Sequence, residues 1–360
     1  MKTHRMSICL MNDNFYRSSG AAIAIRRISE AYSEIEYCVA GTGDRKPEDL
    51  SWVPDGLYRQ FRLKTANPAL LLVELYRFKR WFKLRGCDLV HCHHRRLATL
   101  LNWSGVPVLY SGHLAFPEAR WFRWFHPRWM TAITPSVAAN ISETTGTDVL
   151  AIIGNPVHFP AAPPAVDVES VKHRAICIGR FDPVKGHKHL LRAWKILLDR
   201  GHQYHLDLVG EGDLRADLEA QTKLDGTQHL IHFCGFLDDV MPVIEKSLFS
   251  ILASEVEGQG IVTLEAATAG RPSLLTAVPG SIDMLPPNRT LPNGVTFGNA
   301  EQLADAIGEW FSRPSDTVRE GMLFFDFLEA LSRPAEVAKA YNDVYTRLAP
   351  RRQSAARRSK

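Results

Sequence analysis

Glu257-Gly258-Gln259-Gly260-Ile261-Val262-Thr263-Leu264-Glu265 joins a strand-like segment to a helix-like segment of the 360-residue sequence. Residues 248–253 form an apolar run typical of a buried strand. Residues 264–269 favour a helix that stops at Gly270. The two glycines let the backbone turn tightly and approach a ligand. A helix that begins near Ile261 would point its free N–H groups into this turn, so the turn suits an anion.

Two carboxylates frame the same turn, Glu257 at its entrance and Glu265 in the early helix. A carboxylate does not hold a phosphate, but it accepts hydrogen bonds from sugar hydroxyls. An anion-binding backbone beside two such carboxylates is the chemistry of a nucleotide-sugar site. This stretch by itself leaves open the alternative of an ordinary strand–turn–helix with solvated glutamates.

The two glutamates have seven residues between them, with Ala253-Ser254 before them and residues 266–272 (AATAGRP) after them. This pattern resembles the signature of the retaining GT-B glycosyltransferases of family GT4. The resemblance implies an α/β fold in which two Rossmann-like, doubly wound domains face a cleft and a C-terminal helix crosses back to the first domain. It extends over nearly the whole chain, and its specific motifs lie in residues 175–298.

Strand-like and helix-like segments alternate through both halves, which predicts parallel sheets with ligands at the carboxyl ends of their strands. A chain of 360 residues suits two domains. We expect an N-terminal acceptor-side domain over 1–155, a linker over 156–172, a nucleotide-sugar-binding domain over 173–332, a helix over 333–349 that packs on the first domain, and a basic disordered tail over 350–360.

Composition and charge restrict where the protein works. The six cysteines are scattered, mostly within apolar strand-like runs, so we interpret them as small buried side chains in a reducing compartment rather than as disulfides. No apolar run approaches the length of a membrane span. We expect a cytoplasmic protein, with a peripheral position on the inner face of the cell membrane as an additional hypothesis. Residues 1–158 carry a net charge of +7 and residues 159–360 one of −3, which favours an anionic partner for the first half.

Residues 68–85 and 120–129 combine basic residues with Trp and Phe in the basic half. Such segments suit an anionic membrane surface. The alternative is that the aromatic side chains belong to the core and the bases form a solvated face.

The resemblance implies roles for residues of the motif at 257–265 and of a second motif, Gly179 to Gly186. Glu265 would bind the ribose hydroxyls, and Glu257 would position the sugar hydroxyls. Arg180 and Lys185 would hold the diphosphate together with the amides of the turn, because two cations on a strand–helix loop can clamp it.

Other implied residues lie farther along the chain in both directions. The loop at Gly20 would face the donor phosphates, and His113 would lie near the transferred sugar. The candidate catalytic residues are therefore Glu257, Arg180, Lys185 and His113. The candidate donor-binding residues are Gly20, Gly258, Gln259, Gly260, Ile261, Val262 and Glu265, with Phe236 and Leu237 beside the base.

A metal site is not expected. His91-Cys92-His93-His94 lies in a strand-like segment whose neighbouring side chains point to opposite faces, so at most two of them can converge. The sequence has no second ligand cluster at zinc spacing and no Asp-x-Asp. We therefore predict metal-independent transfer without a cofactor. The nucleotide-diphosphate sugar is a co-substrate, and the sequence leaves the identity of its nucleobase open.

The predicted function is that of a hexosyltransferase-type glycosyltransferase in cell-surface polysaccharide or glycolipid synthesis. The alternatives are another GT-B enzyme, such as a nucleotide-sugar epimerase or a glycan phosphorylase, and a non-catalytic protein that binds anions or nucleic acid. A nucleic-acid partner is not expected, since the basic groups lie apart from the glycine loops and no nucleic-acid motif is present.

Overall fold

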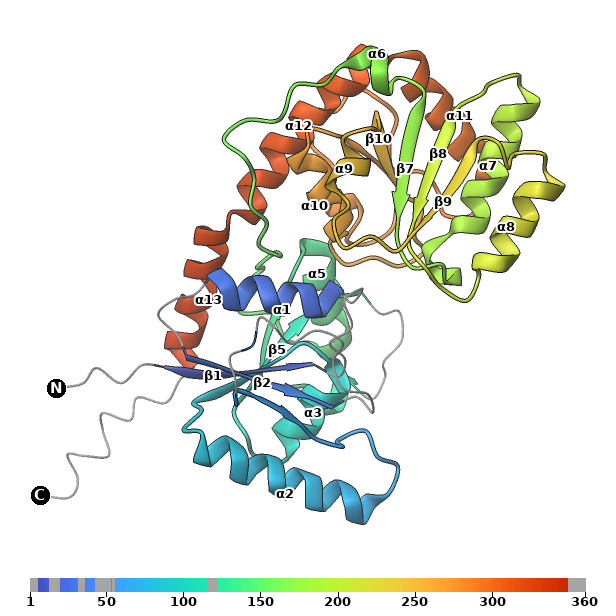
Figure 1. The fold of residues 1–360 in the computed structure, drawn as a ribbon. Coiled ribbons are helices and arrows are strands. Elements are labelled where there is room, and N and C mark those ends of the chain that lie inside the picture. Colours follow the sequence, from blue (N-terminus) through green and yellow to red (C-terminus); the bar gives the residue numbers. More distant parts are fainter. Residues whose placement is uncertain are drawn as a thin grey trace, which may run out of the picture. The chain divides into compact units, whose positions relative to one another are not determined.

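The structure is a computed structural model, and it describes residues 6–12, 20–31, 36–42, 53, 56–115 and 122–348. The chain divides into two compact units (Figure 1). The first unit combines Met1–Pro156 with Pro334–Lys360, and the second is the continuous segment Val157–Arg333. The predicted tail, 350–360, lies outside the described residues.

The first unit is built on a six-stranded sheet in which all paired strands are parallel. Its strands are β1 (Ser7–Asn12), β2 (Glu36–Gly41), β3 (Tyr58–Gln60), β4 (Leu89–Cys92), β5 (Val108–Gly112) and β6 (Trp129–Ala132). Their order, β3-β2-β1-β4-β5-β6, is that of a doubly wound sheet. The crossover from one side to the other therefore falls between β1 and β4, where ligands of such sheets bind.

Helices cover both faces of this sheet. The helices are α1 (Gly20–Ala31), α2 (Pro68–Leu84), α3 (Arg95–Trp103), α4 (Phe122–Phe125), α5 (Pro135–Thr145) and α13 (Pro334–Leu348). Side chains alternate along a strand, so Ile8 and Leu10 of β1 share a core with α1 and α13. Cys9 and Met11 of β1 share the opposite core with α2, α3 and α5. The last helix of the chain is thus a structural part of the first unit.

The second unit contains a five-stranded parallel sheet. Its strands are β7 (Arg174–Ile178), β8 (His205–Val209), β9 (Ile231–Gly235), β10 (Phe249–Leu252) and β11 (Ser273–Leu275), in the order β11-β10-β7-β8-β9. The first strand again lies at the centre and the chain winds to both sides of it. The prediction of two Rossmann-like doubly wound domains is confirmed.

Seven helices accompany this second sheet among the described residues: α6 (Val168–Val171), α7 (His187–Asp199), α8 (Arg215–Leu224), α9 (Met241–Ile244), α10 (Ile261–Thr268), α11 (Ala300–Ser312) and α12 (Pro314–Ser332). One core joins α7, α8 and α11 to one face of the sheet around Trp194 and Trp310. Two smaller cores join α9, α10 and α12 to the other face. The segment 156–172, interpreted from the sequence as a linker, runs along this unit: Val157 is buried, and its N–H donates to the carbonyl of Ser332 at 2.9 Å.

The cysteine prediction is right in five positions of six. All six thiols are free, and five are buried in the two units, whereas Cys234 on β9 is exposed. Among the described residues, no helix combines the length and the apolarity that crossing a bilayer requires.

Candidate active site

The turn before α10 has a left-handed glycine at its centre. Gly260 is the residue before the helix, with φ of +57°, and α10 begins at Ile261. A methyl group at position 260 would lie 2.9 Å from Leu252 Cδ2 and 3.1 Å from Thr263 Oγ1. Glycine is therefore required here by both backbone conformation and space. The helix directs its first free N–H groups toward the turn that holds Gly258 and Gln259, both buried.

The two motifs of the second unit meet through an ion pair. The Nζ of Lys185 donates to Oε2 of Glu257 at 2.8 Å, with the side chains 25% and 12% exposed. Behind this pair, Gly186 has φ of +69°, and a side chain there would overlap the backbone oxygen of Ala253. The loop after β7 and the loop after β10 are thus in backbone contact, and this contact brings Lys185 to Glu257.

Arg180 occupies a different position on the same loop. Its guanidinium pairs with Asp182 at 2.7 Å, and its side chain is 63% exposed. Asp182 also accepts a hydrogen bond from the N–H of Lys185 at 3.2 Å, where a 3₁₀ turn over Pro183–Lys185 begins. Asp182 therefore orders the loop and holds Arg180 along it, whereas Lys185 is the cation that reaches the glutamate motif.

Two further loops complete this junction. Gly210, after β8, has φ of +142° and packs on the backbone of Gly179. Gly280, after β11, has φ of +85° and packs on the backbone of Gly258. At the carboxyl edge of the sheet, the loop after β7 therefore contacts the loops after β8 and β10, and the loop after β10 contacts the loop after β11. We call this arrangement the loop junction.

The loop junction contains buried polar atoms without a hydrogen-bond partner among the described residues. These are the hydroxyls of Ser254, Thr263 and Ser281 and both ring nitrogens of His187. Each of the four residues is at most 1% exposed, and burial lowers the pKa of His187 to about 4. Unpaired buried polar groups are rare in folded proteins, and a catalytic role is one of the explanations for them. Sequence reasoning missed all four, because a single hydroxyl in a loop or helix gives no pattern.

The remaining donor-binding candidates of this unit surround the junction. Phe236 follows β9 and is 45% exposed, and Leu237 beside it is partly buried. Glu265 is half-buried in the second turn of α10. Glu265 thus lies on the same helix as the free N–H groups, while the Phe236 ring offers a flat apolar surface to solvent.

The first unit holds the other two candidates. Gly20 opens α1, and the loop that precedes it lies outside the described residues. His113 follows β5, and its Nε2 is 2.7 Å from Nδ1 of His93. His91 contacts Tyr345 through Nδ1 and Ser111 through Nε2, both at 2.7 Å. Within the described residues no group of three or more side chains is arranged to hold a metal ion.

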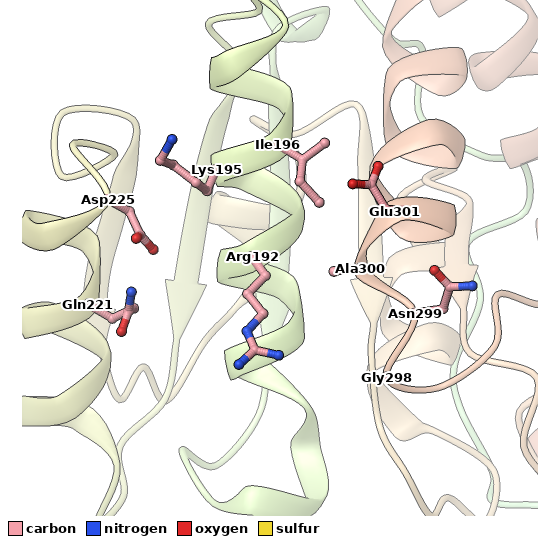
Figure 2. Close-up of a pocket in the computed structure, with 9 residues that line it drawn as sticks. All are labelled: Arg192, Lys195, Ile196, Gln221, Asp225, Gly298, Asn299, Ala300 and Glu301. Atoms are coloured by element: carbon pink, nitrogen blue, oxygen red, sulfur yellow. The ribbon is translucent and has the colours of Figure 1, made fainter.

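Figure 2 shows a shallow depression elsewhere on the second unit, of about 670 Å³. Its walls come from α7, α8 and the start of α11, with Arg192, Lys195, Asp225 and Glu301 among the lining side chains. None of the candidate site residues lines it. It is a separate surface feature.

The basic and aromatic stretches differ in how their aromatic side chains are used. On α2, Phe78 and Trp81 are buried in the core, whereas Leu72, Tyr76 and Leu84 are exposed. In the second stretch, Phe122 is buried and Trp124 and Phe125 are 75% and 61% exposed, while residues 120 and 121 lie outside the described residues. The core alternative therefore holds for part of each stretch, and an exposed apolar part remains.

Both halves of the chain are similar to known glycosyltransferases. Residues 19–159 match the family model "Glycosyltransferase Family 4", and residues 172–313 match "Glycosyl transferases group 1". EpsD of Bacillus subtilis, a putative glycosyltransferase, is 23% identical over 87% of this chain and 91% of its own length. An uncharacterized glycosyltransferase of Methanocaldococcus jannaschii is 32% identical, but the match spans about a third of each chain.

Solved structures share the fold at low sequence identity. HepE of Anabaena, solved in complex with UDP, has a TM-score of 0.79 at 15% identity and covers 95% of this chain and 100% of its own. A glycosyltransferase of Rickettsia africae has a TM-score of 0.79 at 17% identity, with coverage of 97% and 100%. Sucrose-phosphate synthase of Thermosynechococcus elongatus has a TM-score of 0.78 at 18% identity, with coverage of 96% and 99%.

Proposed function

The chain belongs to the group 1 glycosyltransferases of family 4, and from this membership we propose that it moves a sugar from a nucleotide-diphosphate sugar to a glycan or lipid-linked acceptor with retention of configuration. The observation that carries the proposal is the loop junction, which places Lys185, Glu257 and the N-terminus of α10 together. Synthesis of a cell-surface polysaccharide or glycolipid is the role that we assign to the reaction.

The chemistry follows from the leaving group. The bond between the anomeric carbon and the diphosphate oxygen breaks, and negative charge grows on the phosphate, so its stabilisation is the main catalytic requirement. Lys185, Arg180 and the first N–H groups of α10 supply that stabilisation without a metal. The acceptor oxygen bonds to the same face of the sugar, and its proton passes to the leaving phosphate.

Donor binding has to rearrange the ion pair. Lys185 already has a carboxylate partner at 2.8 Å. A diphosphate carries more charge than one carboxylate, so it competes for the ammonium group. Glu257 is then available to accept hydrogen bonds from sugar hydroxyls. In this proposal the pair keeps both groups in position while the donor site is empty.

The test is a thermal-shift screen against UDP-, GDP- and ADP-sugars, followed by transfer assays in excess chelator. UDP-sugars come first, since HepE was solved with UDP. We expect one nucleotide to stabilise the protein and transfer to survive chelation. Lys185→Ala should lower the rate by roughly two orders of magnitude, the scale for losing one preorganised charge-stabilising donor. Lys223→Ala, on the exposed side of α8, is the matched control.

Three results would contradict this proposal. Activity that disappears with chelator and returns with Mg²⁺ or Mn²⁺ would require a metal site. An isomer of the donor formed without acceptor would identify an epimerase. Binding to heparin or DNA with no nucleotide-sugar binding would favour a non-catalytic protein.

We further propose that the enzyme is cytoplasmic and peripheral on the inner face of the cell membrane, through α2. The exposed side of this helix presents Leu72, Val73, Tyr76 and Leu84, each at least 53% exposed. Five bases lie on the helix or at its end: Arg77, Lys79, Arg80, Lys83 and Arg85. Its one acid, Glu74, is buried and pairs with Arg77 at 2.5 Å. A helix with an exposed apolar face, basic side chains beside it and no exposed acidic side chain suits an anionic bilayer.

Liposome co-sedimentation tests the membrane contact. Each base near an anionic surface contributes about 1 kcal/mol, so binding to anionic vesicles should fall with salt and should fail with neutral vesicles. Lys83→Glu with Leu84→Glu should abolish it, whereas Lys223→Glu on the second unit should not. No binding at low salt would refute the contact.

A further inference from the structure

Three histidines converge where β4 and β5 end. His91 is on β4 and His93 follows this strand, so their side chains emerge on the same face of the sheet. Their ring centroids are 4.2 Å apart. His113 follows the neighbouring strand β5, and its ring centroid is 4.9 Å from that of His93. The Nδ1 of His93 and the Nε2 of His113 form a hydrogen bond of 2.7 Å.

The ring of His91 has a fixed position in this cluster. It is fully buried, with Tyr345 of α13 on Nδ1 and Ser111 of β5 on Nε2. Ser111 in turn contacts Thr131 of β6 at 2.5 Å. Because both of its nitrogens are occupied, His91 cannot turn, and its ring supports the ring of His93 in one orientation.

The environment of His93 selects its tautomer. Its side chain is 6% exposed, and its Nε2 has no hydrogen-bond partner among the described residues. A buried N–H without an acceptor costs more than a nitrogen lone pair without a donor, since orphaned buried donors are the rarer case. The proton of neutral His93 therefore lies on Nδ1, and His93 donates to His113. A neutral His113 that accepts at Nε2 must carry its own proton on Nδ1.

We propose that His93 is a positioning residue for glycosyl transfer: it donates from Nδ1 to Nε2 of His113 and so holds His113 as the tautomer that presents an Nδ1–H to a substrate oxygen. The proposal rests on the proposed function and on the position beside the transferred sugar that the resemblance implies for His113. The neutral imidazole then acts as a directed hydrogen-bond donor, and no proton leaves it.

The protonation states agree with this role at neutral pH. Burial lowers the pKa of His113 to about 4. For His93, burial is the main cause and the nearby rings of His91 and His113 add to it, and together they hold its pKa well below the usual range. Within the part of the chain that the structure describes, the titratable rings that face the pair are His91 from β4 and, through His91, Tyr341 and Tyr345 from α13. Burial lowers the pKa of His91 to about 3 and raises the pKa of Tyr341 to about 12, so both are neutral at pH 7 and the pair keeps one directed hydrogen bond.

Two substitutions at one position separate positioning from packing. His93→Leu removes the donor, whereas His93→Asn places an amide N–H near the position of Nδ1. We expect His93→Leu to lower kcat about tenfold or more, as for the loss of one hydrogen bond in the transition state. The KM for the donor should stay within about threefold, since most of the candidate donor-binding residues lie on the second unit. His93→Asn should recover most of kcat, and the exposed His229→Leu is the control.

A second measurement does not depend on activity. In protein labelled with ¹⁵N-histidine, the His113 resonances, assigned with His113→Asn, should show a protonated Nδ1 and an unprotonated Nε2 in the wild type and in His93→Asn. In His93→Leu they should shift toward the Nε2–H form that free imidazole side chains prefer. If His93→Leu does not fold, the wild-type spectrum and His93→Asn still decide the question.

The proposal fails if wild-type His113 is protonated on Nε2, or if His93→Leu keeps the wild-type kcat. Absence of transfer from every donor by the wild type is a different result, since it refutes the proposed function and leaves the spectrum to decide the tautomer.

Discussion

Lys185 and Glu257 are 72 positions apart in the sequence, yet their side chains meet at 2.8 Å. The motifs around them indicate which residue types matter but not that they pair, because pairing depends on the backbone contact between Gly186 and Ala253. The same limit applies to His93 and His113, and to the buried hydroxyls of the loop junction. Sequence spacing names candidates, and packing between distant loops decides which of them touch.

The two glutamates of the motif should fail in different ways. Replacing Glu265 by Ala removes ribose contacts present in both ground and transition states, so donor affinity should fall most. Replacing Glu257 by Ala should mainly lower kcat. Steady-state kinetics with calorimetric titration of the nucleotide separates the two effects. Because Glu257→Ala also leaves Lys185 unpaired, binding of the free nucleoside diphosphate should tighten.

Equal and small effects of both substitutions would return the glutamates to the role of solvated carboxylates. Weaker binding of nucleoside diphosphate by Glu257→Ala would show that the ion pair does not compete with the phosphate.

Buried histidines make stability sensitive to mild acid. The pKa of His91 is lowered to about 3 and that of His187 to about 4, from an ordinary 6.5, with burial as the main cause in both. Between pH 6.5 and 4 the unfolded chain binds protons at these sites and the folded chain does not, so stability falls as pH decreases. Each site contributes a slope of up to about 1.4 kcal/mol per pH unit.

Urea denaturation at pH 7.5, 6.5 and 5.5 measures this dependence in a range where most carboxylates stay ionised. His187→Leu removes one acid-sensitive site and two unpaired buried nitrogens. Its free energy of unfolding should fall less with acid than that of the wild type, without loss at pH 7.5. Equal stability of the wild type at pH 7.5 and 5.5 would contradict the assignment.

Glycines in the loops between helices and strands are of two kinds: some are packed against another loop, and others face open space. Substitution of one glycine of each kind by alanine distinguishes them. Gly186 and Gly226 have φ of +69° and +71°, so alanine strains both backbones by about 1–2 kcal/mol. An added methyl at 226 meets nothing within 4 Å, whereas one at 186 overlaps the backbone oxygen of Ala253. Gly186→Ala should therefore lose clearly more stability than Gly226→Ala and should also weaken nucleotide binding. Equal losses in the free energy of unfolding would mean that the loops of the loop junction can shift to accommodate the methyl group at little cost.

Helices and strands were predictable where hydrophobic periodicity was strong. The C-terminal helix, expected over 333–349, is Pro334–Leu348 in the structure. The helix α12 was not predicted, although Phe324, Phe325 and Leu328 on it are buried. Its first residues, Pro314 to Asp316, follow the end of α11 almost directly, so the sequence offers no loop that separates the two helices.

At the scale of the whole molecule, the stability of the first unit depends on α13. Val337, Tyr341, Val344 and Tyr345 are each at most 4% exposed and fill the core shared with β1 and α1. At about 1.5–3 kcal/mol for each large buried side chain, their loss is comparable to the whole stability of a domain. A chain that ends at Arg333 should therefore lose the folded first unit and keep the second, which is continuous from Val157 to Arg333.

Hydrogen exchange read by mass spectrometry can follow each unit separately in that shortened chain. Amides of β1, β4 and β5 should lose protection, and those of β7 and β8 should retain it. A chain that ends at Leu348 is the control, since the basic residues after it are expected from the sequence to be disordered. Protection retained in β1 without α13 would contradict the prediction.

The overall architecture was the most predictable level. Alternating strand-like and helix-like segments predicted parallel sheets in both halves, and the family resemblance of the motif at 257–265 implied two doubly wound domains and a returning last helix. The relation between strand and crossover helix is local and has a fixed hand, so it repeats in each unit. By contrast, the core that residues near the two chain ends share depends on contacts between distant parts of the sequence. Only the structure shows which residues take part in it.

The discontinuous first unit has a consequence for how the protein is made. Residues 1–156 emerge from the ribosome first. At that stage α13 has not been synthesised, so it does not yet cover Ile8, Leu10 and Ile25. The intervening 177 residues of the second unit, Val157–Arg333, must be translated before the missing helix emerges. At 5–20 residues per second this wait lasts roughly nine to thirty-five seconds. The domain that is synthesised first is therefore completed last, and the apolar side chains of this core stay uncovered until α13 emerges.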